Sequence, residues 1–187
     1  MSPGVAVYDV DAPDARAQLL HAFEEAAAGH ARDAAYTAEL AAWSGRHADS
    51  QGVPGRNAVP AADPTVRPFA DPRLAEAVVR DTDEAARLLV VCTASDDPES
   101  WLRAGEAASA VLLNATVHGL ASCALTEPLE IPRLRERIRA GILGGFGYPQ
   151  LLIRMGWAAT SAAPIPATPR LALHEVVRPL ASADTAR

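Results

Sequence analysis

The sequence predicts a globular protein in which helices pack against a β-sheet. Over residues 87–156, apolar segments of strand length alternate with longer helical patterns, in the order strand, helix, strand, helix, strand. This alternation predicts a two- or three-layer α/β arrangement. The chain has 187 residues, 49% of them hydrophobic, which suits a single domain that spans residues 1–187.

Two helices are expected in the first quarter of the chain. Residues 13–43 are rich in alanine and charged residues at helical spacing, with an interruption near Gly29. In the second helix, Tyr36, Leu40 and Trp43 share one face, because they are spaced by four and then three residues.

A long irregular segment follows over residues 46–72. Its composition is incompatible with a continuous helix or a central strand, because proline and glycine recur throughout: Gly52, Pro54, Gly55, Pro60, Pro64, Pro68 and Pro72. Loops of this length inside a compact domain are usually functional covers or disordered segments. Four apolar side chains favour an ordered cover held against the body: Trp43, Val53, Val66 and Phe69.

The next two elements are a central strand and a long helix. Residues 87–93 are apolar and β-branched on both faces, as a central strand requires. Asp97 is placed as the N-cap of a helix over residues 98–118, and Pro98 occupies its first position. Because its second half carries few polar residues, we expect most of its circumference to be buried. Four small residues of this helix would let another backbone approach closely: Ala104, Gly105, Ala108 and Ala115. They favour a central or subunit-interface helix, although a plain core helix fits equally well.

Three more elements and a last apolar segment complete the pattern. A strand over residues 120–126 ends at Glu127-Pro128, and an amphipathic helix begins at Pro132. This helix directs three apolar residues inward, namely Leu134, Ile138 and Ile142, and four arginines outward, namely Arg133, Arg135, Arg137 and Arg139. We expect the arginines to form a solvated face rather than a ligand site. A strand over residues 149–156 follows, and residues 171–177 are expected to form the last strand.

Charge excludes several functional classes. The 17 basic residues are outnumbered by 23 acidic ones, which gives a net charge of −6 and disfavours nucleic-acid binding. Every basic residue is an arginine, so the chain cannot supply a Schiff-base lysine or a P-loop lysine.

The two cysteines and the apolar runs indicate an unexported protein. Cys92 and Cys123 lack the spacing of metal sites and are expected to be buried thiols, in a reducing, cytoplasmic compartment. The apolar runs are shorter than the roughly 20 residues that span a bilayer, and the N-terminus lacks a signal-peptide pattern, so no membrane association is expected.

The sequence contains no self-sufficient catalytic motif. GxSxG, HExxH, GxGxxG and Walker motifs are missing, and the histidines show no metal-ligand spacing, so we assign no metal site and no catalytic side chain. Ser122-Cys123 near His118 is a weak nucleophile candidate, because a thiol in a buried strand is poorly placed to ionise. A bound organic cofactor that supplies the chemistry is the remaining interpretation.

Several sequence blocks occur in a characteristic order: YTAELAAWSGR at 36–46, GVPGRN at 52–57, LRAGEAAS at 102–109, LTEPLEI at 125–131, GYPQLLIRMGW at 147–157 and TPR at 168–170. In this order they resemble the Acg-type nitroreductase-like family of actinobacteria, over about three quarters of the chain. The resemblance implies an α+β nitroreductase-like (FMN-binding) fold, with a central sheet flanked by helices. By the same resemblance, residues 46–72 correspond to a segment that covers a flavin like a lid in that family.

The resemblance also implies how a flavin site is assembled. In the wider superfamily the FMN site lies at the junction of two units, which are typically a homodimer, whereas Acg-type proteins look like two units fused. This sequence resembles the C-terminal unit only. The family's upstream Asn-Thr-Gln-Pro-Trp segment and Arg-rich stretch are missing from it. We therefore expect a homodimer, or a complex with a chain that carries the missing upstream half.

Five residues match cofactor-binding positions of the family. Leu125, Thr126, Glu127 and Pro128 lie where a strand end passes beside the flavin ring, so their backbone N–H groups would stabilise negative charge there. The alternative is that Glu127-Pro128 merely ends a strand. Arg170 matches the basic residue that contacts the FMN phosphate, and the alternative for it is a surface arginine.

The function implied by the resemblance is that of an FMN-dependent oxidoreductase. Such an enzyme accepts hydride from NAD(P)H and reduces small nitroaromatic, quinone or similar acceptors. Two alternatives remain open from the sequence. The first is a non-catalytic protein that binds or sequesters flavin, and the second is an interface partner subunit that completes a site with another chain.

Overall fold

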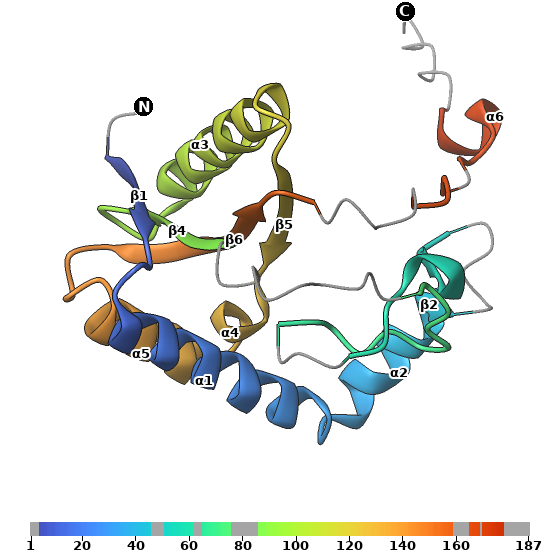
Figure 1. Ribbon diagram of the computed structural model, residues 1–187, viewed down its shortest axis with the longest axis horizontal. Coiled ribbons are helices and arrows are strands. Elements are labelled where there is room, and N and C mark those ends of the chain that lie inside the picture. The colour runs from blue at the N-terminus through green and yellow to red at the C-terminus, as the bar shows by residue number, and fades with distance from the viewer. Residues whose placement is uncertain are drawn as a thin grey trace, which may run out of the picture.

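A four-stranded antiparallel sheet forms the centre of the molecule (Figure 1). The structure is a computed structural model that describes residues 4–45, 51–61, 65–75, 86–158, 165–168 and 170–177. The strands lie in the order β1 (Val5–Asp9), β4 (Arg87–Thr93), β6 (Tyr148–Gly156) and β5 (Ala121–Leu125), and each pair of neighbours is antiparallel. β4 is a central strand, as its two apolar faces predict.

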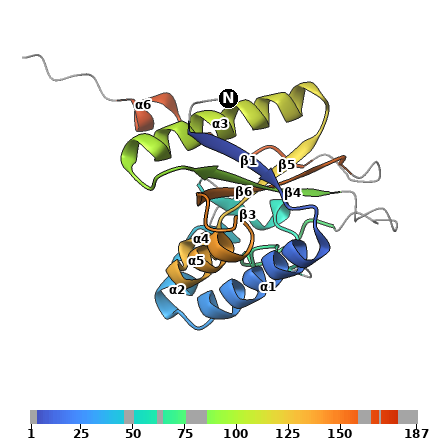
Figure 2. The same ribbon diagram turned by 90° about the vertical axis from the view of Figure 1, so that its left-hand side faces the viewer.

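Helices cover both faces of this sheet (Figure 2). α3 (Pro98–Val117) packs on one face, while α1 (Pro13–His30), α4 (Glu127–Glu130) and α5 (Pro132–Gly141) pack on the other. α3 connects β4 to β5, which run parallel to each other because β6 lies antiparallel between them. The resulting helix, sheet and helix layers confirm the predicted α+β architecture.

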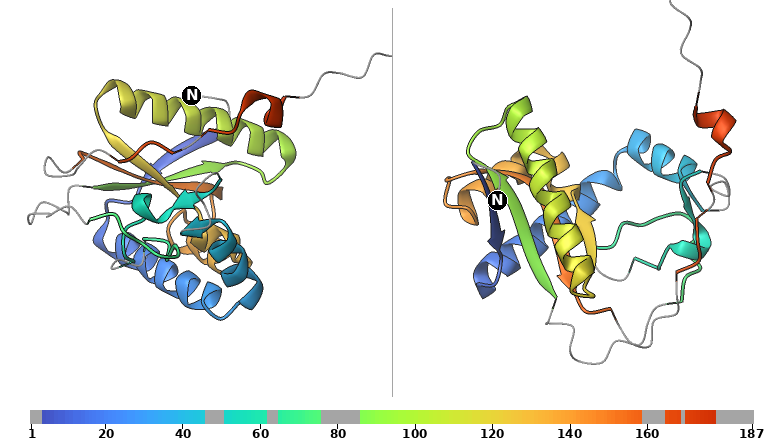
Figure 3. Two further views of the ribbon diagram at one scale, coloured as in Figure 1. Left: turned by 90° about the vertical axis from the view of Figure 1, so that its right-hand side faces the viewer. Right: turned by 90° about the horizontal axis from the view of Figure 1, so that it is seen from above.

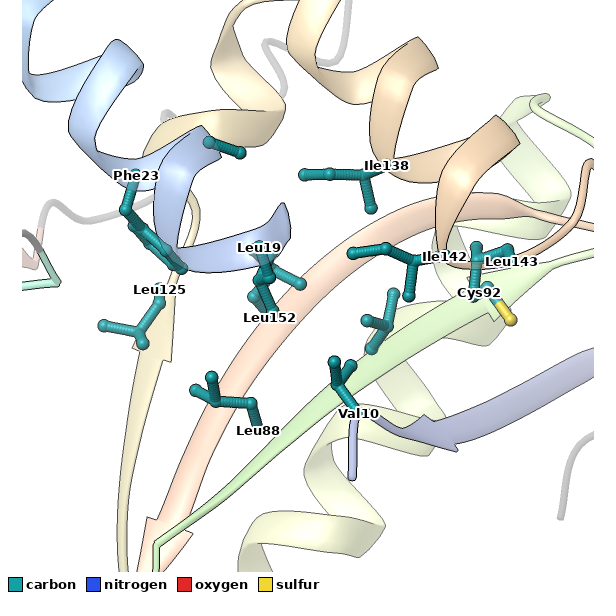
Figure 4. Packing of buried hydrophobic residues seen from close by; sticks show 12 residues of the cluster. Val10, Leu19, Phe23, Leu88, Cys92, Leu125, Ile138, Ile142, Leu143 and Leu152 are labelled. Carbon is teal, nitrogen blue, oxygen red and sulfur yellow. The ribbon is translucent and has the colours of Figure 1, made fainter. Parts of the chain in front are cut away.

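The larger of two apolar cores lies between the sheet and the layer of α1 and α5 (Figure 4). Leu19 and Phe23 of α1 meet Ile138 of α5 and Leu152 of β6 there, and all four are at most 2% exposed. Burying each such side chain stabilises the fold by about 1.5–3 kcal/mol. The smaller core joins α3 to the opposite face of the sheet through Val91, Ala104 and other residues.

The predicted N-cap, Asp97, begins the long helix where expected. The side chain of Asp97 accepts a hydrogen bond of 2.8 Å from the backbone N–H of Ser100, at the start of α3. The predicted interruption near Gly29 is also confirmed, because α1 ends at His30 and Asp33 caps α2 (Ala34–Ala42). Among the described residues, no helix is long and apolar enough to cross a membrane.

The described parts of the predicted cover are ordered by hydrogen bonds. β2 (Ser44–Gly45) pairs in parallel with β3 (Val53–Pro54), and the short 3₁₀ helix η2 (Gly55–Asn57) follows. The Ser44 hydroxyl donates to the carbonyl of Leu40 and accepts from the N–H of Ala70. A Cβ at Gly55 would lie 2.2 Å from the carbonyl oxygen of Asp71, so only glycine allows this approach.

The four apolar side chains expected to hold the cover differ in burial. Trp43 is 53% exposed, and the side chains of Val53, Val66 and Phe69 are only partly buried. Arg46 and Pro64, which belong to the predicted cover, lie outside the described residues.

The expectation that most of the α3 circumference is buried was wrong. Only the face toward the sheet is buried, while Leu102, Leu113 and Val117 are 67%, 66% and 82% exposed. A helix that packs on one face of a sheet buries one stripe of its surface. No described part of the chain covers the other side of α3 (Figure 2).

Two further expectations are corrected. Cys92 is buried as predicted, but Cys123 is exposed, because β5 is an edge strand with most of its residues open to solvent. Residues 171–177 contain a short helix, α6 (Leu173–Val176), instead of a strand, and Leu173 is 74% exposed.

The four arginines of α5 point outward as predicted, and they form ion pairs with the protein itself. Arg133 and Arg137 each contact Glu25 of α1 at 2.6 Å. Arg135 binds Asp96, and Arg139 binds Glu136. The first three ion pairs attach α5 to α1 and to the loop before α3, whereas the Arg139–Glu136 pair lies within α5. All four favour a structural role over a ligand site.

Candidate functional site

The candidate cofactor-binding residues Leu125, Thr126, Glu127 and Pro128 lie where β5 ends and α4 begins. The side chains of Leu125, Glu127 and Pro128 are buried in the protein. Thr126 is partly exposed between the strand and the helix. Of these four residues, only Thr126 therefore keeps its side chain partly open to solvent.

Backbone donors are available at this turn. The carbonyl of Thr126 accepts hydrogen bonds from the N–H groups of Leu129 at 2.8 Å and Glu130 at 3.3 Å. The N–H groups of Thr126 and Glu127 donate to no other residue in the part of the chain that the structure describes. The first N–H groups of a helix lack intrahelical partners and suit an electron-rich acceptor.

The carboxylate of Glu127 is turned toward the helices at the start of the chain. Its side chain is only 6% exposed. Its Oε1 accepts a hydrogen bond of 3.3 Å from the Tyr36 hydroxyl and lies 3.5 Å from Nε of Arg67. Nδ1 of His30, at the end of α1, lies 3.6 Å from the same oxygen. This carboxylate thus binds side chains of the protein.

Glu130 binds two of the same partners. Nη2 of Arg67 donates to its Oε1 at 3.1 Å, and the Thr126 hydroxyl donates to that oxygen at 3.2 Å. Nε2 of His30 lies 3.6 Å from the other oxygen. We refer to His30, Tyr36, Arg67, Glu127 and Glu130 together as the Glu127 cluster.

Ring contacts complete the cluster. The rings of His30 and Tyr36 stack with centroids 4.0 Å apart and an angle of 11° between their planes. The guanidinium of Arg67 lies 5.8 Å from the centre of the Tyr36 ring. The pKa of Tyr36 is raised to about 12, chiefly by burial. The charge of Arg67 lowers this pKa, while the charges of Glu127 and Glu130 raise it further. The Tyr36 phenol therefore stays protonated and acts as a donor at neutral pH.

The Glu127 cluster was only partly visible in the sequence. Tyr36 and Glu130 lie in the sequence blocks that carry the family resemblance. His30 and Arg67 gave no signal, because an isolated histidine and a loop arginine are typical of any protein surface. The pairing of Arg67 with Glu127 depends on how the chain folds, and no local pattern reports it.

Arg170 lies in a different part of the molecule. Its guanidinium donates to the carbonyl and the hydroxyl of Thr168, at 3.2 and 2.7 Å, and the residue is exposed. The carbonyl of Pro166, four residues earlier, accepts a hydrogen bond of 2.8 Å from the side-chain amide of Asn57, which belongs to the predicted cover. Figures 1 and 3 show this C-terminal segment apart from β5 and α4. The structure therefore does not bring Arg170 to residues 125–128.

No protein-family model matches the chain. Two proteins of Mycobacterium tuberculosis that carry the name "Putative NAD(P)H nitroreductase" are similar to it. Rv3131 is 48% identical over 158 residues, which cover 82% of this chain and 46% of Rv3131. Acg is 37% identical over 175 residues, which cover 90% of this chain and 52% of Acg. The chain belongs to the Acg-type nitroreductase-like family.

This member of the Acg-type family spans about half the length of the curated relatives it matches. Among solved structures, it is similar to the FMN-dependent nitroreductase NfnB from Mycobacterium smegmatis, determined in complex with NADPH. That match has 17% identity and a TM-score of 0.49, and it covers 94% of this chain and 78% of NfnB.

Proposed function

We propose that the chain is a nitroreductase-type unit of an FMN-dependent NAD(P)H oxidoreductase. The observation that carries this proposal is the 48% identity over 158 residues with Rv3131, a protein named for NAD(P)H nitroreductase activity. Bound FMN supplies the redox chemistry of such an enzyme, by accepting hydride from NAD(P)H and passing electrons to a nitroaromatic, quinone or similar acceptor. The role of the protein is to bind and orient the reactants.

The strand end at residues 125–128 is the proposed contact to the flavin ring. Its free backbone donors, the N–H groups of Thr126 and Glu127, suit a group on which negative charge develops during reduction. The Glu127 carboxylate is engaged with Tyr36 and Arg67, so it adds no exposed negative charge beside these donors. Leu125 and Pro128 fix the segment by burial. We therefore propose that the backbone N–H groups of Thr126 and Glu127, rather than side chains, contact the flavin ring of FMN.

Arg170 is the proposed contact to the FMN phosphate, and we propose that a second unit completes the site. A guanidinium binds phosphate through paired, charge-assisted hydrogen bonds. The C-terminal segment that carries Arg170 lies apart from β5 and α4, which favours a site in which one unit supplies the ring contact and another supplies the phosphate contact. In this proposal residues 1–187 act as one domain. They associate as a homodimer or with a chain equivalent to the rest of the longer relatives.

Exposed apolar side chains on α3 and just after β6 support that association. Leu113 and Val117 lie open on α3, and Trp157, just after β6, is 76% exposed. Apolar side chains of this kind are buried when a partner covers them, and their burial favours association. A second nitroreductase-like unit is the proposed occupant of this surface.

Anaerobic titration of the FMN-loaded chain with NADPH and NADH tests the enzymatic proposal. We expect the flavin absorbance to bleach and then to recover when a nitroaromatic or quinone is added. A flavin that dithionite reduces and neither nicotinamide reduces would replace this proposal with a flavin-sequestering function. The contacts of Arg67 with α4, which fasten part of the predicted lid, favour that function as the second candidate.

A further inference from the structure

The helix α4 carries the proposed flavin contact and is too short to define its own orientation. It contains four residues, Glu127–Glu130, which is about one turn. An isolated turn of helix is unstable in water, so contacts with other elements must set its direction. The direction of α4 in turn sets where the N–H groups of Thr126 and Glu127 point.

The Glu127 cluster supplies polar contacts to α4, in addition to its apolar packing, in which Pro128 is fully buried and Leu129 packs against the main core. Both carboxylates of α4, on Glu127 and Glu130, are bound by Arg67 and flanked by His30. The partners come from three different parts of the chain: the end of α1, the helix α2 and residues 65–75. α4 is thereby connected to each of them.

Glu127 is the central member of this network. Its carboxylate is almost completely buried and lies next to the backbone donors, whereas Glu130 is more exposed. A buried carboxylate that loses its cationic partner keeps its desolvation cost, so the surrounding structure moves to solvate it. The position of α4 is therefore sensitive to the balance between Glu127 and Arg67.

We infer that Glu127 is a positioning residue, which together with Arg67 holds α4 so that the N–H groups of Thr126 and Glu127 face the flavin. This inference rests on the proposed function. Glu127 acts through the backbone of its own turn, and its side chain does not touch the cofactor.

The test compares four variants with the wild-type chain: Arg67→Met, Glu127→Gln, the double variant that combines both, and Arg73→Met. Arg73 is the matched control, because it lies in the same segment, residues 65–75, and pairs locally with Asp71 at 3.1 Å. FMN affinity is measured by quenching of flavin fluorescence. Hydrogen exchange is measured at the N–H groups of Leu129 and Glu130, which bond to Thr126, in the chain without FMN.

We expect each single variant at the cluster to bind FMN about tenfold more weakly, as the loss of one charged hydrogen bond predicts. The same variants should exchange the Leu129 and Glu130 amide protons faster. The double variant should bind FMN no more weakly than Arg67→Met, because it leaves no unpaired carboxylate at Glu127. Arg73→Met should match the wild type in both measurements.

Two results overturn the inference. The first is that Arg67→Met and Glu127→Gln both keep the FMN affinity and the amide exchange of the wild type. The second is that Arg73→Met loses as much FMN affinity as they do, which would indicate general weakening of the segment. Variants are compared only after circular dichroism shows native helix content, and Arg67→Gln, which also removes the charge, replaces Arg67→Met if the latter does not fold. If the wild-type chain takes up no FMN, the proposed function fails. Exchange in the FMN-free chain still decides whether the Glu127–Arg67 pair holds α4.

Discussion

The guanidinium of Arg135 donates two hydrogen bonds to Asp96, at 2.6 Å to Oδ2 and 2.9 Å to Oδ1. Arg135 lies on α5, and Asp96 lies next to Asp97, the N-cap of α3, so the pair connects the helical layers on opposite faces of the sheet. Arg135, followed by Trp101 and Gln150, holds the pKa of the Asp96 carboxyl well below its usual range. This ionised carboxylate is one source of pH-dependent stability.

Replacing Asp96 by Asn should reduce the loss of stability in acid. The folded-state pKa of Asp96 lies below the unfolded value of about 3.9, so its stabilisation is present above that value. It is lost as the pH falls toward the folded-state pKa. Urea unfolding at pH 7 and pH 3 should show a smaller decrease for Asp96→Asn than for the wild type. Equal decreases would contradict a stabilising role of the Asp96 charge.

Truncating Leu152 should destabilise the main core. Its side chain is 1% exposed between β6 and α1, and Leu→Ala changes at such sites cost about 2–5 kcal/mol of unfolding free energy. Leu173→Ala on α6 is the control, because Leu173 is 74% exposed and should change stability by less than about 0.5 kcal/mol. Chemical denaturation of both variants compares the two sites. Similar losses would show that the packing in Figure 4 is wrong.

Replacing Tyr36 by Phe should destabilise the chain by about 1 kcal/mol, the net contribution of a typical hydrogen bond. The change removes the hydroxyl that donates to Glu127 and preserves the ring that stacks on His30. Tyr8→Phe is the matched control, since the Tyr8 hydroxyl forms no hydrogen bond with another described residue. Thermal unfolding is measured for both variants, and Tyr36→Phe should melt at a lower temperature than Tyr8→Phe. Equal melting temperatures of these two variants would contradict the Tyr36–Glu127 hydrogen bond.

Introducing a charge at Val117 should disrupt association of the proposed units. Val117 is 82% exposed at the end of α3, where we place a second unit. Burying an unpaired carboxylate in an apolar interface is costly, so Val117→Asp should shift the chain toward monomers in sedimentation velocity. Val176→Asp on α6 is a matched control that keeps the wild-type distribution. An unchanged distribution for Val117→Asp would place the interface elsewhere.

Local sequence signals predicted the elements whose patterns lie within a short stretch of chain. The strand at Arg87–Thr93 was predicted with its observed ends, and the Asp97 cap correctly marked the start of α3. β1 was missed, because five residues at the start of the chain become a strand only by pairing with β4. The exposure of Cys123 was missed for a similar reason, since only the strand order makes β5 an edge.

The contact of residues 125–128 with a flavin stays a prediction, and the direction of their side chains was not visible in the sequence. The resemblance placed residues 125–128 beside a flavin, and the structure locates them at a turn with free backbone donors. It did not indicate that the Glu127 side chain turns toward Tyr36 and Arg67, because these partners are distant in sequence. Side-chain direction at a strand end depends on the tertiary neighbours, which local patterns do not report.

The absorption spectrum of the purified chain, recorded with and without added FMN and after removal of free flavin, tests the central proposal most directly. We expect a yellow protein that retains about one FMN per site after gel filtration, with a flavin band that differs from that of free FMN. A colourless chain that takes up no added FMN, alone or mixed with a second unit, would contradict the assignment of a flavin-binding function.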